Sequence, residues 1–156
     1  MQTIILFDWG NTLMVDFPQY RGKMCDWPEI EVMPHAAETL SSLSEHCALY
    51  IATSAKDSAV CDIELAFERV GLARYLSGYF CFANLGLEKD SAQFYRKVSQ
   101  QLREEPEAIM MVGDNWDKDI LPARQAGLRA IWLTECLSDE VETIVSLKQL
   151  PEVLKG

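Results

Sequence analysis

The chain has 156 residues, of which 49% are hydrophobic and 24% are charged, and we expect residues 1–156 to form a single soluble domain. Its formal net charge of −10 at pH 7 argues against nucleic acid as the main partner, since phosphate backbones are bound by clustered Lys and Arg. The chain has no apolar run near the roughly 20 residues of a membrane span and no basic signal-peptide segment, so we expect no membrane association.

Apolar runs alternate along the chain with amphipathic stretches. The runs predict five strands, at residues 3–8, 47–53, 78–83, 108–113 and 129–133. Strands that alternate with helices are typical of a parallel sheet with helices on both faces. We therefore expect an α/β fold with a doubly wound parallel sheet.

The amphipathic stretches predict the helices that cover this sheet. Residues 35–46 and 57–70 each place apolar side chains on one helical face. Residues 90–103 open with Asp-Ser-Ala-Gln, which resembles a capping box. A further helix is predicted to begin near Asp119 and to end at Gly127.

Polar side chains follow the predicted strands at the points where each strand ends. Asp8 follows the first strand, and Thr53 and Ser54 follow the second. Lys89 lies in the connection after the third strand, and Asp114 follows the fourth. Ligands of open α/β sheets bind beyond the carboxyl ends of the strands, so we expect these side chains to line one crevice.

Four segments carry a recognisable series of motifs. Residues 7–13 read Phe-Asp-Trp-Gly-Asn-Thr-Leu, and residues 50–54 read Tyr-Ile-Ala-Thr-Ser. Lys89 comes next, followed by Met-Met-Val-Gly-Asp at residues 110–114 with Asp119 close behind. In this order the segments resemble the four motifs of the haloacid dehalogenase (HAD) superfamily. The resemblance implies a Rossmann-like core whose five strands lie in the order 3-2-1-4-5.

The resemblance also implies a magnesium-dependent hydrolase, in the first place a phosphatase. Asp8 would attack phosphorus and form an aspartyl phosphate, which splits hydrolysis into two easier steps. Mg²⁺ prefers oxygen ligands, and Asp8, Asp114 and the backbone carbonyl of Gly10 would supply them. Lys89 would neutralise the charge that gathers on Asp8 and the phosphoryl oxygens.

Four further residues complete the site that the resemblance implies. Thr53, Ser54 and Asn11 would orient the substrate. Asp119 would hold Lys89 or a metal-bound water. Simpler structural interpretations stay open for two of the charged residues. Asp119 could be a helix N-cap, and Lys89 could be a solvated lysine at a helix start.

Gly10 departs from the pattern of the superfamily's phosphatases, which usually carry a second aspartate at this position. That aspartate protonates the leaving oxygen and then activates the attacking water, and such proton transfer is worth about 10²–10⁴-fold in rate. We therefore expect slow turnover of alkyl phosphates and a preference for aryl or acyl phosphates. Asp16, Asp26 and His35 are candidates to supply the proton instead.

Phosphonatases and haloacid dehalogenases, two branches without this acid, rely on a cap domain after the first motif. Here the segment from roughly residue 14 to residue 34 is long enough only for a flap and a connector, so we expect no large cap domain. A phosphonatase also needs a Schiff-base lysine from its cap, and Lys23 is the only lysine in the flap segment. Both branches are therefore disfavoured.

Two other functions stay open at this point. A catalytically weak module that binds phosphorylated ligands could also keep Asp8, Lys89 and Asp114 while lacking the acid. A nucleotide-binding domain is disfavoured, because no GxGxxG or GK[ST] loop follows any strand. For the hydrolase we expect a phosphorylated small molecule or a phosphoprotein as substrate, with homo-oligomerisation as one way to cover an open site.

The number and spacing of the cysteines indicate the cellular compartment in which we expect the protein. The five cysteines are odd in number and form no CxxC pair. This pattern favours reduced thiols over a disulfide framework or a zinc site, and we expect a cytoplasmic protein.

Overall fold

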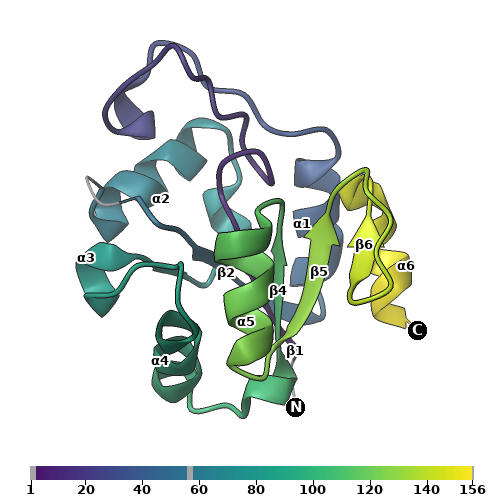
Figure 1. Ribbon diagram of the computed structural model, residues 1–156. Coiled ribbons are helices and arrows are strands. Elements are labelled where there is room, and N and C mark those ends of the chain that lie inside the picture. Colours follow the sequence, from purple (N-terminus) through teal and green to yellow (C-terminus); the bar gives the residue numbers. More distant parts are fainter. Residues whose placement is uncertain (1–2, 56–57, 156) are drawn as a thin grey trace.

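The computed structural model describes residues 3–55 and 58–155 (Figure 1). Six parallel strands form one sheet in the order β3-β2-β1-β4-β5-β6. The strands are β1 (Thr3–Phe7), β2 (Cys47–Ala52), β3 (Gly78–Phe80), β4 (Ile109–Gly113), β5 (Arg129–Leu133) and β6 (Glu142–Ile144). The α/β class and the order of the first five strands are thus confirmed, and a sixth strand extends the sheet beyond β5.

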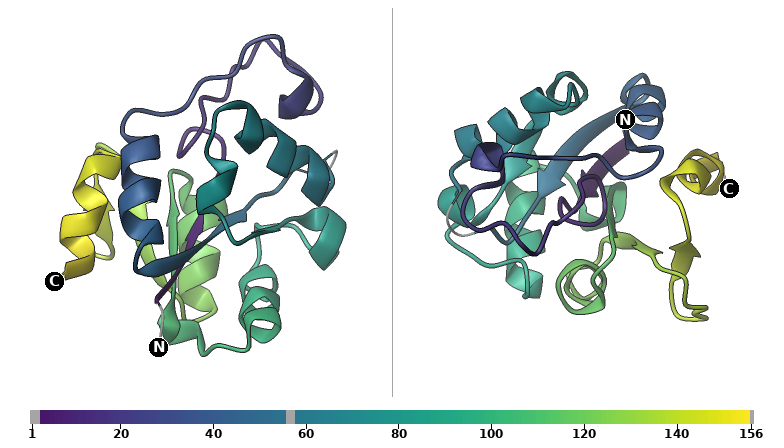
Figure 2. Two further views of the ribbon diagram at one scale, coloured as in Figure 1. Left: turned by 180° about the vertical axis from the view of Figure 1, so that it is seen from behind. Right: turned by 90° about the horizontal axis from the view of Figure 1, so that it is seen from above.

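Helices cover both faces of the sheet, which makes it doubly wound. Helices α1 (Ala36–Ser44), α2 (Val60–Arg69) and α6 (Leu150–Lys155) pack on one face, and they come forward in the view from behind (Figure 2). Helices α3 (Phe82–Leu85), α4 (Ala92–Leu102) and α5 (Leu121–Gln125) pack on the other (Figure 1). Side chains of β1 alternate between these two cores, with Ile5 in the first and Leu6 in the second.

Short helical turns complete the secondary structure. They are the 3₁₀ turns η1 (Met24–Asp26), η2 (Ala73–Tyr75), η3 (Pro106–Ala108) and η5 (Leu147–Gln149), and the π-helical turn η4 (Trp116–Ile120). No helix of the described residues is long and apolar enough to cross a membrane.

Several predicted boundaries shift by a few residues. The predicted start of the second helix at residue 57 lies outside the described residues, and α2 runs over Val60–Arg69. The predicted strand 78–83 ends early, because Asn84 Oδ1 accepts a hydrogen bond from Cys81 N at 2.8 Å and begins α3.

The predicted helix start near Asp119 is also shifted. Helical structure begins earlier, at Trp116, because the side chain of Asn115 accepts a hydrogen bond from Lys118 N at 3.0 Å. Asn115 is therefore the N-cap, and Asp119 is free to serve the site instead of the helix end.

The segment between β1 and α1 forms a flap above the carboxyl ends of the strands (Figures 1 and 2). Its two ends pair in an antiparallel manner, since Val15 N donates to Glu31 O at 2.8 Å and Met33 N donates to Leu13 O at 2.8 Å. Within residues 3–55 and 58–155 this flap is the only excursion after β1, and there is no large cap domain.

The far end of the flap is tied to α2. The guanidinium of Arg69 donates from Nη1 to Trp27 O at 2.7 Å and to Cys25 O at 3.1 Å. Lys23 forms an ion pair with Asp62 at 3.0 Å. These contacts hold the flap in one position over the sheet edge.

Candidate active site

A buried lysine joins two carboxylates at the carboxyl edge of the sheet. Lys89 Nζ lies 2.6 Å from Asp8 Oδ1 and 2.6 Å from Asp119 Oδ1, and it donates to Ala52 O at 3.1 Å. Lys89 is only 2% exposed, Asp119 is fully buried and Asp8 is 8% exposed. An ammonium group has three donors, so all of the hydrogen-bonding capacity of Lys89 is used.

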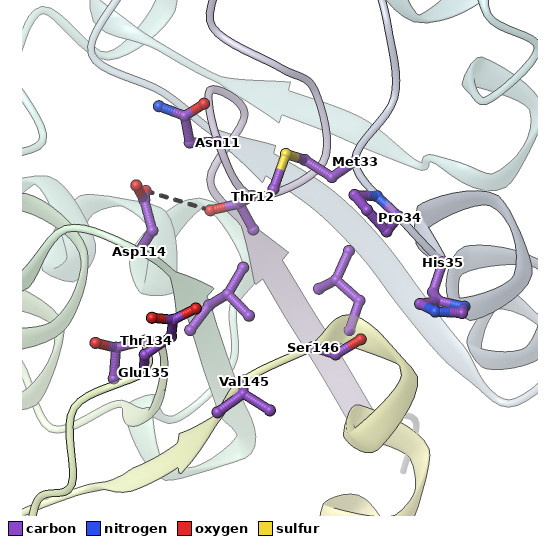
Figure 3. Close-up of a pocket in the computed structure, with 12 residues that line it drawn as sticks. Asn11, Thr12, Met33, Pro34, His35, Asp114, Thr134, Glu135, Val145 and Ser146 are labelled. Carbon is purple, nitrogen blue, oxygen red and sulfur yellow. Dashed lines mark hydrogen bonds between the residues drawn. The ribbon is translucent and has the colours of Figure 1, made fainter.

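The turn after β1 sets the orientation of Asp8. The amide of Asp8 still belongs to the sheet, since it donates to Val112 O at 2.9 Å. The chain then turns sharply, with Leu13 N and Met14 N both donating to Trp9 O. This turn brings Thr12 Oγ1 back to 3.1 Å from Asp8 Oδ2. The same hydroxyl lies 3.4 Å from an oxygen of Asp114 (Figure 3).

Sequence reasoning gave Thr12 no role of its own, although this hydroxyl bridges the two acids. Its place within the first motif was the available signal, because a short turn after a strand returns the chain toward the strand end. The residue is fully buried, and its hydroxyl lies within hydrogen-bond distance of both acids.

A glycine makes room for Asp119. A Cβ atom at position 113 would lie only 2.3 Å from Asp119 Oδ2, closer than atoms can approach. Asn115 N donates to the same Oδ2 at 3.0 Å, while Lys89 takes Oδ1. Both oxygens of Asp119 are thus engaged by the protein itself.

Charge balance distinguishes Asp8 from the other acids. Burial acts to raise the pKa of Asp8, but the Lys89 ammonium and several hydrogen bonds outweigh burial and hold this pKa below its usual value. Burial acts to lower the pKa of Lys89, but the charges of Asp8 and Asp119 outweigh it and raise this pKa. Asp8 is therefore an ionised carboxylate held by a fixed cation.

The remaining acids carry more negative charge than Lys89 can balance. Burial raises the pKa of Asp114 to about 7, and the hydrogen bond and charge of Asp8 add to this effect. Burial also raises the pKa of Asp119 to about 6, against the opposing influence of Lys89. Three carboxylates thus share one cation, which leaves an excess of negative charge.

A divalent cation fits this excess. Asp8, Asp114 and Asp119 each offer an oxygen atom within 4.8 Å of the others. Lys89 and the Asn115 amide engage the two oxygens of Asp119. Asp8 Oδ2 and Asp114 Oδ1 both lie near the Thr12 hydroxyl, at 3.1 Å and 3.4 Å, and these two oxygens are the candidate metal donors. An all-oxygen donor set with uncompensated negative charge is the environment that Mg²⁺ prefers.

Two hollows flank this cluster. The larger, about 340 Å³, adjoins Asp114 and Asn11 and has an apolar wall that includes Met33 and Leu133 (Figure 3). The smaller, about 180 Å³, lies under the flap and is lined by Trp9, Gly10, Asp16, Gly22, Met24, Trp27, Thr53, Ala55 and Ser58. The larger hollow thus adjoins the cluster at Asp114, and the smaller one adjoins the first motif at Gly10 and the second at Thr53.

The predicted substrate-binding residues lie around the cluster, and their engagement differs. Thr53 is buried, and its Oγ1 accepts a hydrogen bond from Ala55 N at 3.1 Å. Ser54 Oγ is buried without a hydrogen-bond partner among the described residues. Asn11 is exposed, and its Oδ1 accepts a hydrogen bond from Asp16 N at 3.1 Å.

A sequence model of the haloacid dehalogenase-like hydrolases matches residues 10–127, which is most of the chain. The chain belongs to this family. The predicted membership of the HAD superfamily is therefore confirmed, and the cluster around Lys89 lies within this fold.

Two curated relatives of this HAD-like hydrolase are phosphatases. Phosphoserine phosphatase of Thermus thermophilus is 36% identical over 70 residues, 45% of this chain and 28% of that protein. Glyceraldehyde 3-phosphate phosphatase of Methanothermobacter thermautotrophicus is 30% identical over 97 residues, 55% of this chain and 43% of that protein. The chain thus matches less than half the length of these relatives.

Solved structures share the fold over nearly the whole chain. An uncharacterised protein of Listeria monocytogenes serotype 4b superposes with a TM-score of 0.86 at 25% identity, over 98% of this chain and 97% of that one. A HAD-hydrolase of Bacillus subtilis, solved with magnesium bound, superposes with a TM-score of 0.78 at 14% identity, over 99% of each chain. The comparisons thus agree on the HAD-like hydrolase family, to which both curated phosphatases are similar over part of their length.

Proposed function

We propose that this HAD-like hydrolase is a magnesium-dependent phosphatase that forms an aspartyl phosphate on Asp8. The observation that carries the proposal is the buried Lys89, whose Nζ lies 2.6 Å from both Asp8 and Asp119. This arrangement keeps Asp8 ionised, oriented and ready to attack an electrophile. Oxygens of Asp8 and Asp114 beside it are the proposed donors to a metal ion.

Asp8, Asp114 and the backbone carbonyl of Gly10 would hold the Mg²⁺ ion. When bound, the ion supplies positive charge that lets the anionic phosphate approach the anionic nucleophile. Asp119 would hold Lys89 in place, since Lys89 Nζ lies 2.6 Å from its Oδ1 and the Asn115 amide donates to its Oδ2.

The chain's own residues carry the two chemical steps. In the first, an oxygen of Asp8 forms a bond to phosphorus, and the bond from phosphorus to the leaving oxygen breaks with its electron pair. In the second, water attacks the same phosphorus, and Asp8 departs as a carboxylate. Lys89 stabilises the charge at both stages, while Thr53, Ser54 and Asn11 would orient the phosphoryl oxygens.

The substrate is proposed to be a phosphorylated small molecule. The two curated relatives are named as phosphatases of small phosphorylated metabolites. The hollow of about 340 Å³ beside Asp114 has the volume of a small-molecule site. A phosphoprotein is the second candidate, because no large cap among the described residues closes the site.

A phosphatase assay on two variants tests this proposal. We expect Mg²⁺-dependent release of phosphate from a panel of phosphorylated metabolites, and a loss of about 10³-fold or more in Asp8→Asn. Asp117→Asn is the matched control, because Asp117 is an exposed acid close to the site. Equal loss in both variants, or retained activity in Asp8→Asn, would contradict the proposed nucleophile.

Gly10 favours a second candidate function, a catalytically weak module that binds phosphorylated ligands. Such a module would bind phosphate mimics but would not complete repeated turnovers. Counting product per enzyme molecule separates the two candidates, since only an enzyme exceeds one product per active site. We further propose that the protein acts in the cytoplasm, which the free cysteines of the described chain favour.

A further inference from the structure

The space above Gly10 is filled by a different carboxylate. A Cβ atom built at position 10 would lie 3.4 Å from Asp16 Cβ and 3.7 Å from Asp16 Oδ2. Apart from Gly10 itself and its chain neighbours Trp9 and Asn11, the three heavy atoms nearest to that built position all belong to Asp16. A side chain at position 10 would therefore extend toward the carboxylate that Asp16 already provides.

Asp16 shares the smaller hollow with residues of the site. The hollow of about 180 Å³ is lined by Gly10, Asp16 and Thr53, with the indoles of Trp9 and Trp27 forming an apolar wall. Thr53 directly follows β2, and Asp8 directly follows the neighbouring strand β1. Asp16 thus lines the same hollow as Gly10, next to the space that a side chain at position 10 would enter.

The backbone of Asp16 is fixed while its carboxylate is available. Its amide donates to Asn11 Oδ1 at 3.1 Å, and the neighbouring Val15 N donates to Glu31 O across the base of the flap. The Asp16 carboxylate has no ion-pair or hydrogen-bond partner within residues 3–55 and 58–155. The residue is exposed, so its side chain can meet a substrate that enters the hollow.

The other two candidate acids lie elsewhere. His35 lines the larger hollow instead, and its Nδ1 lies 3.6 Å from Glu38. Asp26 sits at the end of η1 with its carboxylate 3.8 Å from Cys25 Sγ, and it lines neither hollow. Of the three, only Asp16 approaches the space that Gly10 leaves open.

We propose that Asp16 is the proton-transfer residue of this enzyme and replaces the acid absent at position 10. In the first step its carboxyl proton passes to the leaving oxygen as the bond to phosphorus breaks. In the second step its carboxylate takes a proton from the attacking water, while Asp8 is released. Asp16 thus ends the cycle protonated, as it began, and no other reactant is needed.

This inference rests on the proposed function, and it modifies the expectation that alkyl phosphates are poor substrates. With Asp16 in place, an alkyl leaving group can be protonated. The relevant variants are Asp16→Asn and the double variant Gly10→Asp with Asp16→Asn. Asp26→Asn is the matched control, since it removes an acid of the same flap that lines neither hollow.

Steady-state and pre-steady-state assays with Mg²⁺ test the role. Asp16→Asn should lower turnover of glycerol phosphate by about 10²–10⁴-fold, whereas Asp26→Asn should stay within about threefold of the wild type. With p-nitrophenyl phosphate, whose leaving group needs no proton, Asp16→Asn should release one nitrophenolate per enzyme in a rapid burst before slow turnover. The double variant should regain most of the lost rate, because a carboxylate is restored in the same space.

The outcomes separate this inference from the proposed function. Turnover that depends on Asp8 but is unchanged by Asp16→Asn would overturn the role of Asp16 and leave the phosphatase intact. Loss without a burst, or without rescue in the double variant, would assign Asp16 a structural role and also overturn the inference. A wild-type protein without turnover that depends on Asp8 would overturn both. Circular dichroism of each variant checks that it is folded.

Discussion

Lys89 is the residue on which the site depends, because it is the only cation that contacts Asp8 and Asp119 within residues 3–55 and 58–155. Burying the Lys89 ammonium would be unfavourable without the two carboxylates, and burying the two carboxylates would be unfavourable without the ammonium. The same triad keeps Asp8 ionised and engages Oδ1 of Asp119. The Lys89 ammonium therefore serves both the stability of the fold and the proposed chemistry of the site.

Replacing this ammonium should destabilise the protein as well as inactivate it. Lys89→Met leaves two buried carboxylates without their cation, and we expect the free energy of unfolding to fall by about 3–5 kcal/mol. Urea unfolding at neutral pH with a chelator measures the change. Lys118→Met is the control, since Lys118 is exposed; equal stability of the two variants would contradict the account.

A second prediction at the residue scale concerns the stability of a variant at Gly113. Gly113→Ala places a methyl group 2.3 Å from Asp119 Oδ2, so Asp119 or the backbone of β4 must move. We expect a loss of about 1–3 kcal/mol in stability. Gly10→Ala is the comparison in the same unfolding assay, because its methyl group would meet nothing closer than 3.4 Å. A Gly113→Ala protein as stable as wild type would show that the space beside Asp119 is not limiting.

At the scale of elements, the sequence pattern predicts the positions of those strands whose side chains are buried in the core. Strands β1 and β4 are apolar runs covered on both faces, so their positions could be read directly, and Asp8 and Asp114 followed as the residues at their ends. Strand β6 was missed because it has three residues and only Ile144 is buried. An element that buries one side chain leaves no hydrophobic period to recognise.

The conformation of the flap, like strand β6, could not be predicted from the sequence pattern. Its conformation depends on particular contacts, such as those of Arg69 and Asn11, rather than on a repeating pattern. Sequence reasoning could therefore name Asp16 among several candidate acids, but it could not choose between them. The choice came from the distance of Asp16 to the space above Gly10.

Loosening the flap should weaken substrate binding more than the chemical steps. Arg69→Met removes two hydrogen bonds to flap carbonyls, and we expect a loss of about 1 kcal/mol in stability and a several-fold higher KM. Hydrogen exchange should increase in the flap around η1. Arg124→Met on α5 is a matched control of an exposed arginine. A variant whose exchange and KM match this control would argue that the flap is held by other contacts.

At the scale of the whole molecule, the acidic site makes stability depend on pH and metal. Asp114 and Asp119 bind protons more strongly in the folded protein, with pKa values of about 7 and about 6, than in the unfolded chain, where Asp titrates near about 3.9. Stability of the metal-free protein should therefore fall as pH rises from about 4 to about 7. The lowered pKa of Asp8 acts only below this window.

Urea unfolding in a chelator at about pH 5 and about pH 8 measures this dependence. We expect the metal-free protein to be less stable at the higher pH and Mg²⁺ to restore stability there by mass action. Asp114→Asn should flatten the pH dependence and abolish the effect of Mg²⁺. Stability that rises between the two pH values, or a magnesium effect retained in the variant, would contradict the proposed metal site. Homo-oligomerisation stays a prediction, which sedimentation can check.

The most direct test of the account is to find the phosphoryl group on the enzyme. Wild-type protein turning over p-nitrophenyl phosphate with Mg²⁺ is quenched rapidly in acid, and its peptides are mapped by mass spectrometry. We predict one phosphoryl group on the peptide that contains Asp8, labile to hydroxylamine and absent from Asp8→Asn. Steady turnover with the phosphoryl group on another peptide, or undiminished turnover in Asp8→Asn, would contradict the assignment of Asp8 as the nucleophile.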